Sequence, residues 1–168
     1  MFRSHFLGFL LAATAFAQVA AVTAEEAKQL AFMREEEKLA RDLYRHFYQK
    51  YNLAVFDRIA RSEQAHFDAI GQLLARYQVA DPAANLPEGN YANSDLQALY
   101  QQLAAKGDLS LRDALDVGVI VEKTDIADLE TSLRATVKAD MKRVFQNLMA
   151  ASYNHLEAFE ECWQVSAQ

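Results

Sequence analysis

Residues 24–51 read AEEAKQLAFMREEEKLARDLYRHFYQKY, a stretch that contains neither glycine nor proline. Apolar and aromatic residues recur in it every three, four or seven residues, at Leu30, Met33, Ala40, Tyr44, Phe47 and Tyr51. This period places them on one face of an amphipathic helix. The spacing therefore predicts a long helix over residues 24–51.

The segments that follow predict a helical hairpin. A short turn at residues 51–54 leads into residues 55–78, where Phe56, Ile59, Ile70, Leu73 and Tyr77 keep the helical period. The main break comes after this second helix, in residues 81–94 (DPAANLPEGNYANS), because this stretch holds both prolines of the chain.

Two more long helices are expected beyond the break. Ser94 and Ser110 have the character of N-caps, for a short helix over residues 95–106 and for a third long helix from residue 111. Asp140 is predicted to cap a fourth long helix that runs to about residue 163. The fold class is therefore all-α, a four-helix bundle. A single long crossover with a short extra helix in it is the ferritin-like variant of such a bundle.

Composition supports this fold class. The chain has only 5 glycines and 2 prolines in 168 residues, too few for the turns of a β-sandwich or barrel. Its length fits one domain, expected over residues 25–165. The single Cys162 rules out an internal disulfide and a cysteine-based zinc site. A net charge of −6 argues against a nucleic-acid partner.

Residues 1–24 have the features of a secretory signal peptide. Arg3 and His5 precede the apolar run FLGFLLAATAFA of residues 6–17, which ends in a small-x-small pattern. We predict cleavage near residue 17 or residue 24 and a periplasmic or secreted protein. The run is shorter than the ~20 residues that span a bilayer, so no stable membrane anchor is expected.

Polar residues interrupt the apolar face of every long helix near its middle. Buried carboxylates are costly unless they are paired or bind a metal ion. Four carboxylates and two imidazoles on four inward faces are the ligand set of a carboxylate-bridged dinuclear site for two iron ions, or for iron and manganese. The predicted metal ligands are Glu37, Glu63, His66, Glu122, Asp125 and His155.

Two details of this ligand set follow from helical spacing. Glu63 and His66 lie three residues apart, so both side chains can address one ion. Glu36 is the alternative to Glu37 on the first helix, because both flank the apolar stripe. The rest of the Glu35–Glu37 run is expected to face solvent.

The sequence also resembles a known family over residues 24–163. The stretches EEEKLARDLYRHFYQKY, FDRIARSEQAHFDAIGQLLARY, GNYANSDLQALYQQL, ALDVGVIVEKTDIADLE and FQNLMAASYNHLEAFE are similar, in that order, to a prokaryotic ferritin-like family of unknown function. This resemblance implies a four-helix fold related to rubrerythrins and bacterioferritins. It implies no settled activity.

The chain departs from the general ferritin-like metal pattern on its last helix. That pattern has Glu, E-x-x-H, Glu and E-x-x-H on successive helices, whereas Ser152 stands three residues before His155 here. Asp125, one turn after Glu122, could supply the missing oxygen ligand. A mononuclear site or a different metal stays open.

Three functions are compatible with these residues. The first is an envelope oxidoreductase that reacts with peroxide or dioxygen. It would need an external electron donor, because the chain has no rubredoxin-like four-cysteine segment. The second is a metal-binding module without turnover, and the third is an interaction bundle whose inward polar groups pair with each other. A homodimer is compatible with all three.

Overall fold

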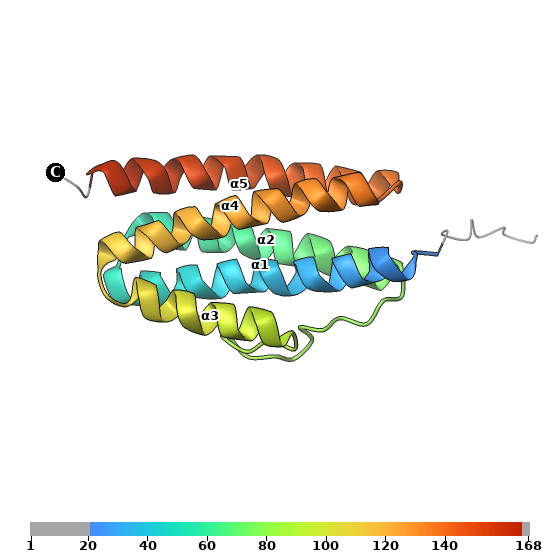
Figure 1. The fold of residues 1–168 in the computed structure, drawn as a ribbon, viewed down its shortest axis with the longest axis horizontal. Helices are drawn as coiled ribbons and strands as arrows, with labels where there is room; N and C mark the ends of the chain where they lie inside the picture. The colour runs from blue at the N-terminus through green and yellow to red at the C-terminus, as the bar shows by residue number, and fades with distance from the viewer. Residues whose placement is uncertain (1–20, 166–168) are drawn as a thin grey trace, which may run out of the picture.

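The computed structural model describes residues 21–165, which form five helices (Figure 1). Their bounds are α1 Ala24–Tyr51, α2 Ala54–Arg76, α3 Ser94–Gly107, α4 Leu111–Ala135 and α5 Ala139–Val165. The all-α class and the expected order of four long helices and one short one are confirmed. The segment assigned to a signal peptide lies outside the described residues up to position 20.

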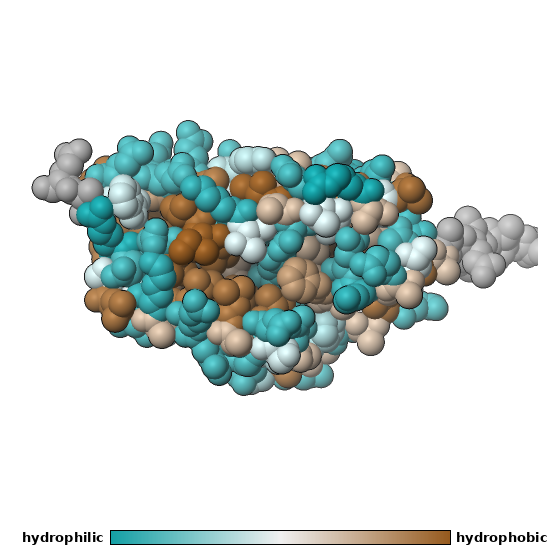
Figure 2. All heavy atoms as spheres, in the orientation of Figure 1, coloured by the Kyte–Doolittle hydropathy of each residue, from teal (hydrophilic) through white to brown (hydrophobic). Residues whose placement is uncertain are grey.

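The long helices pack as two hairpins, α1 against α2 and α4 against α5. The chain between the hairpins runs back along the bundle and includes α3, so α4 starts at the end of the molecule where α2 starts (Figure 1). α3 packs against α1 and α4 on the outside of the bundle. The face seen in Figure 2 is largely hydrophilic, with hydrophobic residues gathered left of its centre. None of the described helices is long and apolar enough to cross a membrane.

Two apolar clusters fill the bundle, one on each side of a polar layer. The first cluster includes Leu43, Phe56 and Leu115, and the second includes Leu30, Ile70, Leu129 and Phe145. On each long helix the inward polar residues fall between the segments that enter the two clusters. Each helix therefore carries its polar residues to the same level of the bundle, with apolar packing above and below.

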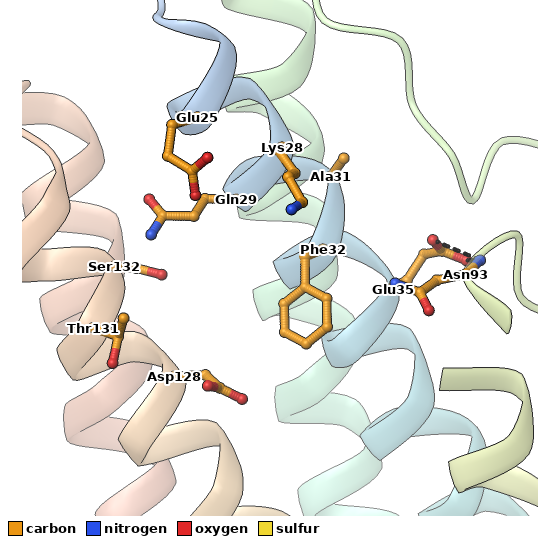
Figure 3. Close-up of a pocket in the computed structure, with 10 residues that line it drawn as sticks. All are labelled: Glu25, Lys28, Gln29, Ala31, Phe32, Glu35, Asn93, Asp128, Thr131 and Ser132. Atoms are coloured by element: carbon orange, nitrogen blue, oxygen red, sulfur yellow. Dashed lines mark hydrogen bonds between the residues drawn. The ribbon is translucent and has the colours of Figure 1, made fainter. Parts of the chain in front are cut away.

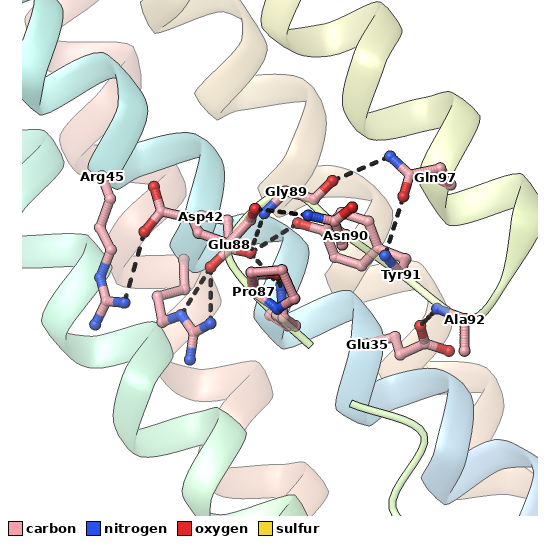
Figure 4. A network of polar contacts seen from close by, with 12 residues as sticks. Glu35, Asp42, Arg45, Pro87, Glu88, Gly89, Asn90, Tyr91, Ala92 and Gln97 are labelled. Carbon is pink, nitrogen blue, oxygen red and sulfur yellow. Dashed lines mark hydrogen bonds and ion pairs between the residues drawn. The ribbon is translucent and has the colours of Figure 1, made fainter. Parts of the chain in front are cut away.

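A buried ionic network ties the crossover to α1 (Figure 4). The Asp42 carboxylate is fully buried and lies 2.6 Å from the Lys38 ammonium, and the Arg41 guanidinium also pairs with it. It accepts hydrogen bonds of 3.0 Å from the Tyr91 hydroxyl and from the backbone N–H of Gly89. Gly89 has a φ of +75°, which favours glycine at this turn. These bonds hold the crossover against the middle of α1.

Helix starts differ slightly from the predicted ones. Ser110 caps α4 as expected, with its hydroxyl accepting from the N–H of Asp113. The prediction for α3 was wrong by one residue, because the side chain of Asn93 is the cap. Asp140 lies inside the first turn of α5, and its carboxylate instead accepts a 2.7 Å hydrogen bond from the Tyr77 hydroxyl.

Candidate metal centre

Five of the six predicted ligands converge in the polar layer. Glu37, Glu63 and His66 form one group whose ligand atoms lie within 4.8 Å of one another, and Glu63, Glu122 and His155 form a second. All five residues are buried. Glu63 belongs to both groups, so α2 supplies a carboxylate that lies between two candidate ion positions.

The distances show how Glu63 is shared. Its Oε2 lies 2.7 Å from Nδ1 of His66, and its Oε1 lies 2.7 Å from Nδ1 of His155. Each histidine also has a carboxylate of its own, because Glu37 Oε2 is 3.3 Å from the first Nδ1 and Glu122 Oε2 is 3.5 Å from the second. Glu63 is thus one carboxylate shared between two carboxylate–imidazole pairs.

These short contacts are not aligned as hydrogen bonds. Nδ1 of both histidines and Oε1 of Glu63 are buried atoms without a hydrogen-bond partner. Unpartnered buried polar side-chain atoms are rare in proteins. Of the seven found in the described part of the chain, six lie in or beside this layer: Glu36 Oε2, Glu37 Oε1, Glu63 Oε1, His66 Nδ1, Asp125 Oδ1 and His155 Nδ1. Ligand atoms that converge in this way without partners are suited to a metal ion.

Mutual contacts shift the pKa values of these groups strongly. Burial alone would raise the pKa of Glu63, but the neighbouring His155 and His66 lower it to about 2. Burial alone would lower the pKa of the histidines, but the carboxylates raise that of His66 to about 11 and that of His155 to about 9. Burial raises the pKa of Glu37 to about 8. These shifts favour protonated imidazoles in the metal-free chain, so an ion that binds here displaces their protons.

Asp125 lies beside the two groups rather than in either of them. Its Oδ2 accepts a 2.6 Å hydrogen bond from the hydroxyl of Ser152, and its Oδ1 has no partner. Ser152 occupies the position where the general pattern has a carboxylate. The Ser152 hydroxyl thus holds the Asp125 carboxylate of α4 close to the position that a carboxylate on α5 would occupy in the general pattern.

Tyr44 also contacts the layer, from its place on the apolar stripe of α1. Its hydroxyl donates a 2.7 Å hydrogen bond to Glu122 Oε1, which leaves Glu122 Oε2 toward His155. The ring packs against Phe159 at 5.0 Å between centroids. Its place two turns from Glu37 on α1 was the only sequence signal for this contact.

The prediction that most of the Glu35–Glu37 run faces solvent is wrong. All three residues are buried, with exposed fractions of 3%, 6% and 1%. The crossover covers this side of α1, where Glu35 accepts from the backbone N–H of Asn93. Glu37 is the residue that meets the histidines, while Glu36 faces Asp125 and Asp128.

Comparison with known proteins gives the family. Residues 26–165 match the family described as "Uncharacterized protein domain (DUF2202)". The chain belongs to this family. It is similar to the uncharacterized protein MJ0754 of Methanocaldococcus jannaschii, with 47% identity over 138 residues that cover 82% of this chain and 75% of that protein. The crystal structure of MJ0754 superposes with a TM-score of 0.85 at 44% identity, over 88% of this chain and 84% of the other.

Proposed function

We propose that this chain is a ferritin-like metal protein whose polar layer holds two ions, either two irons or iron with manganese. The observation that carries the proposal is the position of Glu63, whose two oxygens each lie 2.7 Å from a different histidine. A carboxylate in that position suits a bridge between two ions. The two hairpins and the long crossover between them also suit the ferritin-like topology.

The donor chemistry fits these metals. Carboxylate oxygens and imidazole nitrogens are hard to intermediate ligands that suit iron and manganese, and no thiolate takes part. Iron bound here would supply redox chemistry toward peroxide or dioxygen. Glu37 and Glu122 would each hold one ion beside its histidine, and the Tyr44 hydroxyl would keep Glu122 in place. The apolar clusters on both sides limit the access of water.

The second candidate function is structural: the polar groups of the layer pair with each other, and the chain has no bound metal and no turnover. The contacts of Glu63 with two imidazolium groups favour it, because they balance much of the buried charge without an ion. The two candidates differ in one measurable property, the affinity of the folded chain for Fe²⁺ or Mn²⁺.

Metal analysis after anaerobic loading tests the proposal. We expect two ions per chain in the wild-type protein, and fewer in Glu63→Ala and His155→Ala. His46→Ala is the matched control, because His46 pairs with Asp108 outside the layer. A wild-type chain that binds no iron, manganese or zinc would refute the proposal, and full loading of both ligand variants would show that the ligands are wrong.

Turnover is a separate part of the proposal. We propose an envelope protein that consumes peroxide or dioxygen with electrons from an external donor. If the metal-loaded protein consumes peroxide or dioxygen and the Glu63→Ala variant does not, the result supports an enzyme. Stoichiometric loading without consumption supports a metal carrier.

A further inference from the structure

A cavity of about 390 Å³ opens between the first half of α1 and the last half of α4 (Figure 3). Gln29 and Phe32 line it from α1, and Asp128 and Ser132 line it from α4. Its walls carry the carboxylates of Glu25 and Asp128 and the ammonium of Lys28 beside the apolar side chain of Phe32, whereas the Glu35 carboxylate accepts from the backbone N–H of Asn93. Asp128 thus places a carboxylate on the cavity wall.

The line of contact between α1 and α4 behind this cavity, called the seam below, leads to the polar layer. On α1, positions 25, 29, 32 and 36 follow one another at spacings of four, three and four, so Glu36 continues the row that lines the cavity. On α4, positions 132, 128 and 125 do the same in the opposite chain direction. Since the two helices are antiparallel, both rows run from the cavity to Glu36 and Asp125 (Figure 1).

At the inner end of the seam, one oxygen atom of each carboxyl group lacks a partner. Glu36 is 6% exposed, and its Oε2 is buried without a hydrogen-bond donor, as is Oδ1 of Asp125. The carboxyl of Asp128 lies within hydrogen-bonding reach of Glu36 and also lines the cavity. The one unpartnered buried atom outside the polar layer, among the described residues, is Oε1 of Gln29 on the cavity wall. Carboxyl groups thus continue from Asp128 on the cavity wall through Glu36 to Asp125 beside the centre.

We propose that this seam is the route by which divalent cations enter the centre, with Asp128 and Glu36 as successive stations between the cavity and Asp125. The inference rests on the proposed metal centre, since it describes how the same site is filled. Carboxylate oxygens are ligands that divalent cations prefer in proteins. Each of these residues therefore offers an oxygen ligand to a passing cation, and none of them needs to hold it at equilibrium.

A second opening competes with this route. His66 and His155 are 7% and 8% exposed, so the histidine side of the layer, where α2 packs on α5, also approaches solvent. On the other side of the layer, Asp128 lines the cavity between α1 and α4, and Glu36 lines a smaller one that α3 helps to form. We assign ion entry to these carboxylates, and the two paths differ in which variants would take up ions slowly.

Stopped-flow uptake of Co²⁺ by the metal-free protein tests the route. We expect Glu36→Gln and Asp128→Asn to slow uptake by about tenfold or more while the final stoichiometry and absorption spectrum stay unchanged. Glu130→Gln is the matched control, because it removes one carboxylate from the same helix at a residue paired with Arg134 outside the cavity. The wild-type rate should also fall with ionic strength more steeply than that of Asp128→Asn.

The outcomes separate the route from the centre. A wild-type protein that binds no Co²⁺, Fe²⁺ or Mn²⁺ refutes the centre itself. Normal wild-type loading with unchanged rates in both variants overturns the route and points to entry past the histidines. A lower final stoichiometry in Glu36→Gln also overturns it, because Glu36 would then be a ligand. Asp128→Asn keeps the test decisive if the buried Glu36 variant folds poorly, since Asp128 is only half-buried.

Discussion

Glu63 differs from the other residues of the layer because it contacts both histidines. Glu37 approaches only His66, and Glu122 approaches only His155. The two candidate ion positions thus share one residue and are otherwise independent. Substitutions at Glu37 and Glu122 should therefore each affect one ion position, whereas a substitution at Glu63 should affect both.

We predict that Glu37→Gln loses the ion beside His66 and keeps the one beside His155, whereas Glu63→Gln loses both. The amide of glutamine keeps the shape of the side chain but removes the charge that a metal ligand needs. Metal analysis of the purified variants, with circular dichroism to verify folding, measures the difference. Equal losses in the two variants would contradict the bridging role of Glu63.

Gly118 supports the layer indirectly. A Cβ at this position would lie 2.8 Å from atoms of the Phe159 ring, which in turn packs against Tyr44. We predict that Gly118→Ala destabilises the fold by about 1–3 kcal/mol in spite of the better helix propensity of alanine, because the aromatic ring must move.

Urea unfolding measures this effect. A double variant Gly118→Ala/Phe159→Leu should recover part of the loss, since leucine leaves more room beside the new methyl group. Additive losses in the double variant would show that the two residues are not coupled.

The start of α1 bears on the predicted cleavage of a signal peptide. Thr23 caps the helix in a capping box with Glu26, and Val22 packs against the apolar cluster that contains Leu30. Cleavage after residue 24 would remove both contacts, whereas cleavage after residue 17 would keep them. Loss of an N-cap costs about 0.5–2 kcal/mol.

We therefore predict that the mature chain starts at Gln18. Intact-mass analysis of protein secreted by a bacterial host gives the position directly. A chain that starts at Glu25 with undiminished thermal stability would contradict the structural role given to Thr23.

At the scale of the elements, helical spacing was sufficient to predict the helices and which residues face inward. It failed for Glu35, because the crossover segment that covers this residue lies more than 50 residues away in sequence. It failed for Glu36, because this residue faces Asp125 and Asp128 of α4. The spacing of residues within one helix carries no information about which distant segment of the chain buries them. The position of Asp125 beside the two groups depends in the same way on Ser152 of another helix.

Over the whole molecule, the buried charges predict how stability depends on pH. The pKa of His66 rises from 6.5 to about 11 and that of His155 from 6.5 to about 9 on folding. Such groups stabilise the fold fully below pH 6.5, and their contribution is lost as the pH rises through the folded values. Glu37, whose pKa rises from 4.5 to about 8, acts in the same direction between those values.

We predict that the metal-free protein loses stability from pH 6.5 to pH 9, while the metal-loaded protein changes little. Metal ions replace the protons on the histidines, so the loaded fold has none to lose there. Urea unfolding in the presence of a chelator, and separately of excess Mn²⁺, gives both curves. Parallel curves would mean that the metal does not bind these groups.

The most direct test of the dinuclear centre is a crystal structure of the Fe²⁺- or Mn²⁺-loaded protein with anomalous scattering measured at the metal edge. We predict two anomalous peaks about 3.5–4 Å apart. The Glu63 carboxylate should lie between them, with one histidine on each ion. No peak in the polar layer, or a single ion that does not contact Glu63, would contradict a bridged two-metal site.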